Sequence, residues 1–83
     1  MNQIQNLDSL IIEKLVNFGK PLLFSEVFDG LVYKEATAIE DDLFSAGKLK
    51  PASKIVATRL QALRTANKIK FNAKWNRGWE VVH

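Results

Sequence analysis

The chain has 83 residues, of which 47% are hydrophobic and 25% charged, and its formal net charge is +3. This length predicts one domain, 1–83, and a domain this small buries only about 60% of the surface of its unfolded chain. The sequence has no cysteine and one histidine, His83, so it offers no disulfide, too few soft ligands for zinc and no Ser–His or Cys–His pair. We therefore expect a protein without catalytic residues, metal or cofactor.

The apolar runs of the sequence are short, and none approaches the roughly 20 residues that a membrane span needs. The first residues, Met1-Asn2-Gln3, also lack the basic start of a signal peptide. These features predict a cytoplasmic protein that makes no use of a membrane.

Charge is distributed unevenly along the chain. Residues 1–47 carry three lysines and eight acidic residues, a net charge of −5, whereas residues 48–83 carry nine basic residues and only Glu80, a net charge of +8. A domain with one basic side orients itself on a polyanion, because only that side is attracted to phosphate. The alternative is an ordinary solvated surface whose two parts neutralise each other.

The first predicted element is an amphipathic helix over about 5–18. Its apolar residues recur at steps of three and four, and Gly19 supplies a left-handed stop. The apolar stripe comprises Ile4, Leu7, Ile11, Leu15 and Phe18. Because the stripe extends to Ile4, this helix offers a surface for a homodimer.

The middle of the chain is predicted as an extended segment, a short helical piece and a second long helix. Pro21 breaks the first helix, residues 22–24 suit a short extended segment, and Ser25 is expected to cap one or two helical turns that run to about Leu31. Thr37 follows.

Thr37 and Glu40 have the spacing of a capping box, in which each side chain satisfies a backbone group at a helix start. This pair predicts a helix over about 35–46 that ends at Gly47. Its expected apolar positions are Ile39, Leu43 and Ala46.

A third long helix is predicted over about 53–66, capped by Ser53 after a turn that contains Pro51 and ended by Asn67. At 100° per residue, two faces separate. The apolar face comprises Ile55, Val56, Leu60, Leu63 and Ala66. The polar face comprises Lys54, Ala57, Thr58, Gln61 and Thr65.

The end of the chain predicts a β-hairpin. Ile69, Phe71, Ala73 and Trp75 alternate with polar residues, the turn residues 76–78 follow, and a second alternating segment covers 79–82. We expect Trp79 to cover the core against Phe71. Trp75 is expected near the turn and half exposed, where hydrophobic packing competes with a partner contact or stacking on a base.

This order of elements resembles the winged helix-turn-helix superfamily over nearly the whole chain. The most specific segment is 53–69, which is similar to a recognition helix that runs into the first wing strand. The matching positions are Ser53, Leu60, Leu63, Asn67 and Ile69. Two departures are Asn67, where glycine is commoner, and a segment 25–46 that is longer than one helix needs. The resemblance implies an α+β fold, with three to four helices before a C-terminal hairpin wing, that binds double-stranded DNA.

In such a fold, the polar face of the 53–66 helix would enter the major groove, where each base pair exposes a distinct pattern of donors and acceptors. Gln61 suits adenine, Thr58 and Thr65 suit base edges or phosphates, and Lys54 suits guanine or phosphate, while the small Ala57 permits close approach. The alternative is a helix surface that is merely exposed to solvent.

Phosphate contacts are expected at both ends of this helix. Ser53 at the helix start presents free amide groups beside Lys50 and Lys54. In the hairpin, basic side chains reach the backbone or minor groove, or else only protect a strand edge. The full candidate set is Lys50, Ser53, Lys54, Ala57, Thr58, Gln61, Arg64, Thr65, Lys68, Lys70, Lys74 and Arg77.

Two charged groups are interpreted as structural. Arg59 lies between Ile55 and Leu63 around the helix, so we expect it to pair with Glu40, Asp41 or Asp42. Asp41 and Asp42 diverge by 100° on a helix, which argues against a shared metal ion and for a solvated acidic face.

The sequence thus predicts a small transcriptional regulator that binds double-stranded DNA, alone, as a homodimer or with another transcription protein. The alternative is a winged-helix protein-interaction module or adaptor, which uses the acidic part of the chain or Trp75 and does not read DNA sequence.

Overall fold

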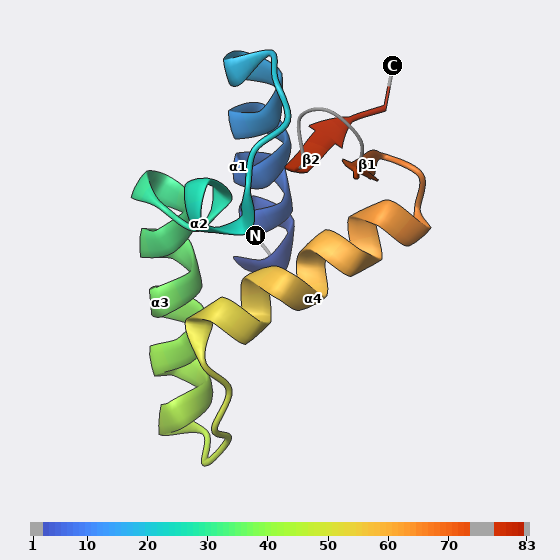
Figure 1. Cartoon of the computed structure of the whole chain (residues 1–83). Coiled ribbons are helices and arrows are strands. Elements are labelled where there is room, and N and C mark those ends of the chain that lie inside the picture. The colour runs from blue at the N-terminus through green and yellow to red at the C-terminus, as the bar shows by residue number, and fades with distance from the viewer. Residues whose placement is uncertain (1–2, 74–77, 83) are drawn as a thin grey trace.

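Four helices precede an antiparallel β-hairpin in the computed structural model, which describes residues 3–73 and 78–82 (Figure 1). This α+β architecture is winged-helix-like, and it confirms the predicted fold class. The elements are α1 (Gln3–Phe18), α2 (Phe24–Val27), α3 (Gly30–Ser45), α4 (Ala52–Thr65), β1 (Ile69–Asn72) and β2 (Gly78–Val81).

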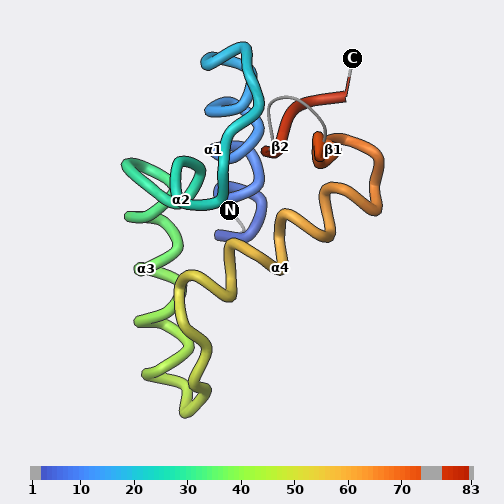
Figure 2. The backbone as a smooth tube through the Cα atoms, in the orientation of Figure 1, coloured from blue at the N-terminus to red at the C-terminus, as the bar shows by residue number. Residues whose placement is uncertain are grey.

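Helix α1 supplies one wall of the core. It lies beside α3, and α4 crosses both of them (Figure 2). Leu7, Ile11 and Leu15 are buried, and Ile4 packs partly against the core. The predicted stripe is therefore confirmed except at Phe18, which is exposed, and most of it is covered by this chain rather than free for a second copy. Among the described residues, none of the helices combines the length and the apolar character that a membrane span requires.

The predicted boundaries between α1 and α3 were wrong. Ser25 does not cap α2, because the N-cap is Leu23, whose backbone N–H donates to Oε1 of Glu26 at 2.9 Å. Helix α2 is a single turn that ends at Val27, and α3 already begins at Gly30, where φ is +57°.

The Thr37–Glu40 capping box does not form, because both residues lie inside α3. The Thr37 hydroxyl donates to the carbonyl oxygens of Tyr33 (3.0 Å) and Lys34 (2.9 Å), as threonine does in a helix interior. The apolar positions Val32, Ala36 and Ile39 continue the helical stripe toward the N-terminus and explain the earlier start. At the other end, Ala46 is exposed instead of buried.

The hairpin is fastened to the rest of the fold through Leu22. The backbone N–H of Leu22 donates to the Trp79 carbonyl at 2.9 Å, and the N–H of Trp79 donates to the Leu22 carbonyl at 2.7 Å. Of the predicted extended segment 22–24, only Leu22 pairs in this way.

Inside the hairpin, Phe71 lies opposite Trp79, and their rings meet edge to face with centroids 5.2 Å apart. Trp79 is buried, which confirms its predicted place over the core. Asn67 has the left-handed φ of +62° that was predicted after the third long helix. The predictions for Lys74, Trp75 and Arg77 lie outside the described residues.

Candidate nucleic-acid interface

The outer face of α4 is polar and open to solvent. The helix presses Ile55, Val56, Leu60 and Leu63 into the core, so the opposite side of the cylinder faces outward. The exposed residues of this outer face are Ser53, Lys54, Ala57, Thr58, Gln61, Arg64 and Thr65. The predicted polar face is therefore accessible along its whole length, although the helix spans 52–65 and Ala66, predicted to be buried, is exposed.

Basic residues follow α4 in the chain. Lys68 in the turn and Lys70 in β1 are both exposed, and a short turn connects the C-terminal end of the helix to this strand (Figure 1). The sequence contains no acidic residue between Asp42 and Glu80. Because no carboxylate within this segment offsets its basic residues, a surface built from the segment attracts phosphate.

One lysine of the hairpin is partly neutralised. Nζ of Lys70 lies 3.2 Å from Oε1 of Glu80, its cross-strand neighbour. The lysine side chain stays largely exposed, so the pair is a surface ion pair of small energy, and the ammonium group remains accessible to an anion.

The start of α4 differs from the prediction. Ser53 is not the cap: the N-cap is Pro51, which makes no side-chain hydrogen bond, and Ser53 is the second residue of the helix. The Ala52 N–H instead donates to Oε2 of Glu40 in α3, at 2.9 Å. A carboxylate thus already occupies the positive end of the helix, and a phosphate at this amide would have to displace it. Lys50, just before the helix, is partly buried.

Arg59 pairs with Asp8 of α1, and not with Glu40, Asp41 or Asp42 as predicted. Its Nε and Nη2 atoms donate to the two carboxylate oxygens of Asp8 at 2.9 and 2.8 Å. The hydrogen bond to Asp8 raises the pKa of the Arg59 guanidinium. The prediction failed because α1 crosses α4 at this position, a tertiary contact that no local spacing reveals. The predicted structural role agrees with this placement, since the two-point pair joins α1 to α4.

The acidic residues of α3 do not converge. Asp41 and Asp42 are exposed, and within residues 3–73 and 78–82 no group of three or more His, Asp or Glu side chains is placed to hold a metal ion.

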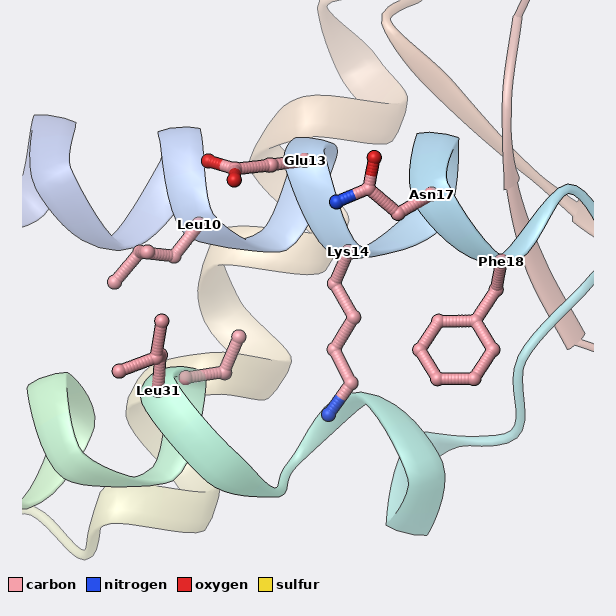
Figure 3. Close-up of a pocket in the computed structure, with 7 residues that line it drawn as sticks. Leu10, Glu13, Lys14, Asn17, Phe18 and Leu31 are labelled. Atoms are coloured by element: carbon pink, nitrogen blue, oxygen red, sulfur yellow. The ribbon is translucent and has the colours of Figure 1, made fainter.

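A separate apolar pocket of about 220 Å³ lies between α1 and the start of α3 (Figure 3). Leu10 and Leu31 approach each other from the two helices, and Phe18 closes one end. Lys14 extends across to the turn before α3, where its Nζ donates to the Asp29 carbonyl at 3.2 Å. Leu10, Phe18, Leu31 and Val32 give the pocket its apolar walls, and Glu13, Lys14 and Asn17 of α1 complete the lining.

Sequence reasoning missed an exposed apolar region at the end of α3, which is separate from this pocket. Phe44 and Leu49 are 67% and 86% exposed. A signal was present, because Phe44 lies 100° away from the buried stripe of α3 and Leu49 stands between two lysines in a connecting segment.

Comparison of the chain with protein-family models, with curated proteins and with solved structures finds no match.

Proposed function

We propose that the chain is a DNA-binding protein of the winged helix-turn-helix type, a small transcriptional regulator. The observation that supports this function is the outer face of α4, which is exposed and free of acidic side chains, and which is followed in the chain by the exposed Lys68 and Lys70. An α-helix fits the major groove of B-form DNA, and the hairpin at the end of α4 would then lie on the flanking backbone.

Within this arrangement, the uncharged side chains of the face read bases. Gln61, near the middle of the exposed face, would pair with the two hydrogen-bonding groups of adenine. Thr58 and Thr65 lie on the same face and would bond base edges or phosphates, and Ala57 leaves room for the groove wall.

The basic side chains supply affinity that is independent of sequence. If Lys54, Arg64, Lys68, Lys70 and the hairpin turn neutralise about five phosphates, log K falls with log[salt] at a slope of about −4 to −5. The acidic part of the chain, 1–47, turns the opposite side of the domain away from the polyanion.

The test begins with selection of bound sites from random duplexes, followed by fluorescence anisotropy titrations on the selected site across a salt series. Gln61→Ala should lower the preference for the selected site by about 1 to 3 kcal/mol, whereas Arg64→Ala should weaken all duplexes alike and reduce the salt slope by about 1. Lys34→Ala, which removes an exposed lysine from α3, is the matched control and should change neither quantity.

The competing function, a protein-interaction module, makes a different prediction in the same system. Backbone amide shifts measured during a titration with duplex DNA should change along 53–70 if the DNA-binding proposal is correct. No salt-dependent binding, or shifts confined to 25–46, would overturn it and favour the interaction module.

A further inference from the structure

The C-terminal end of α3 and the connection to α4 form a projection that carries exposed apolar side chains. This segment extends past the start of α4 (Figures 1 and 2). We call it the α3 tip and define it by Asp41, Asp42, Phe44, Lys48, Leu49 and Lys50. Phe44 and Leu49 are the two most exposed large hydrophobic residues among those described, at 67% and 86%. Adjacent exposed apolar side chains with a polar rim are typical of an interaction surface.

Two hollows adjoin the projecting Leu49. One, of about 210 Å³, also contacts Phe44 and Pro51. The other, of about 560 Å³, is lined by Ile39 and Leu43 of α3 together with Ile4 of α1. The tip thus presents an apolar projection beside recesses that are lined by both apolar and charged side chains, and a surface with a projection and a recess can fit a copy of itself.

The charges of the tip have the same self-complementary character. Each hollow has an aspartate on its α3 wall, Asp41 in one and Asp42 in the other, and both are also lined by Lys48 and Lys50. Within the described residues, ion pairs form at Arg59–Asp8 and Lys70–Glu80, and neither involves the tip.

We infer that the α3 tip is a homodimer interface in which a second copy of this chain packs about a twofold axis. Leu49 of each copy enters a hollow of the other, and Asp41 and Asp42 of each copy face Lys48 and Lys50 of the other. An isologous contact makes each such pair twice. A partner with charge of a single sign would be repelled by half of the tip, whereas a second copy matches both signs.

This inference does not rest on the proposed DNA binding, and it assigns Lys50 to the dimer contact rather than to phosphate. The outer face of α4 begins at Ser53 and the tip ends at Lys50, so the two proposed surfaces share no residue. A contact limited to one end of a small domain predicts a weak dimer, with a dissociation constant on the order of 10 µM.

The test is analytical ultracentrifugation of the full chain without DNA, over a concentration range that spans the expected dissociation constant. The mass should rise from that of the 9.4 kDa monomer toward twice that value. Leu49→Ser and Phe44→Ser should each weaken association at least tenfold, with circular dichroism spectra unchanged. Leu31→Ser is the matched control, because Leu31 is 64% exposed but lies at the opposite end of α3, and it should dimerise like the parent. A parent chain that stays monomeric, or a Leu49→Ser variant that dimerises normally, would overturn the inference.

Charge reversal tests the geometry of the pairing. The double variants Asp41→Lys/Asp42→Lys and Lys48→Asp/Lys50→Asp should each be monomeric, because the twofold contact then places like charges together. An equimolar mixture of the two should associate, because every pair is again of opposite sign. Failure of the mixture to associate would rule out the proposed arrangement.

Discussion

The C-terminal end of α4 leads into a hairpin that packs against the core, whereas the N-terminal end follows a connection that projects into solvent. At the C-terminal end, the chain turns at Asn67 into a hairpin whose Trp79 is buried and bonded through its backbone to Leu22. At the N-terminal end, the helix is held by the Glu40 carboxylate, and the connection before it projects Leu49 into solvent. We therefore expect substitutions near the hairpin to act on the free energy of unfolding, and substitutions in the α3 tip to act on association.

Two glycines with positive φ allow the sharpest comparison of these ends. A Cβ at Gly78 would lie 2.6 Å from the backbone carbon and oxygen of Leu22, whereas a Cβ at Gly47 would meet nothing within 4 Å. We expect Gly78→Ala to lower the free energy of unfolding by about 3 kcal/mol, because the strain of the positive φ adds to the clash with the Leu22 backbone. Gly47→Ala should cost about 1 kcal/mol, from the left-handed conformation alone. Urea unfolding followed by circular dichroism measures both, and equal losses would contradict the difference between the two ends.

The middle of α4 should show the next largest effect, through the pair that joins it to α1. The Arg59 and Asp8 side chains are only 27% and 19% exposed and meet in two hydrogen bonds. Arg59→Ala and Asp8→Ala should each cost about 1.5 kcal/mol, with a coupling of about 1 kcal/mol in a double-mutant cycle. Arg64→Ala, on the exposed face of the same helix, is the control, with a change of about 0.5 kcal/mol or less. Additive single and double losses would show that the pair contributes nothing.

The helix cap at the N-terminal end should have a smaller effect. Glu40→Ala removes the acceptor of the Ala52 N–H and the negative charge at the helix start, so we expect a loss of about 1 kcal/mol. Glu40→Gln keeps an acceptor oxygen and should lose less than Glu40→Ala. Asp41→Ala, on the exposed neighbour, should leave the unfolding free energy within about 0.5 kcal/mol of the parent value. Equal effects of Glu40→Ala and Asp41→Ala in thermal unfolding would argue against the cap.

The smallest effect on stability is expected on the outer face of α4. Thr58→Ala and Gln61→Ala remove side chains that are exposed to solvent, so the free energy of unfolding should change by less than about 0.5 kcal/mol. Both variants should still lose affinity for the selected duplex. A large loss of stability in either variant would mean that the face has a structural role.

Residue periodicity was sufficient for much of the fold. The three- and four-residue spacing of Leu7, Ile11 and Leu15 identified the buried side of α1, and the alternation around Phe71 and Trp79 identified the hairpin and its packed pair. Local cap patterns were less reliable. The Thr37–Glu40 spacing also occurs inside a helix, where Thr37 bonds the preceding turn and Glu40 is free to reach another element.

For the candidate site, the charge asymmetry and the polar side of α4 could be predicted from the residues alone, because both follow from composition and from the 100° rotation per residue. Which groups those residues contact depends on how the helices pack against one another. The partners Arg59–Asp8, Glu40–Ala52 and Leu22–Trp79 come from separate elements, and the crossing of α1, α3 and α4 brings them together. The exposure of Phe44 and Leu49 has the same origin, since an apolar side chain is buried only where another element covers it.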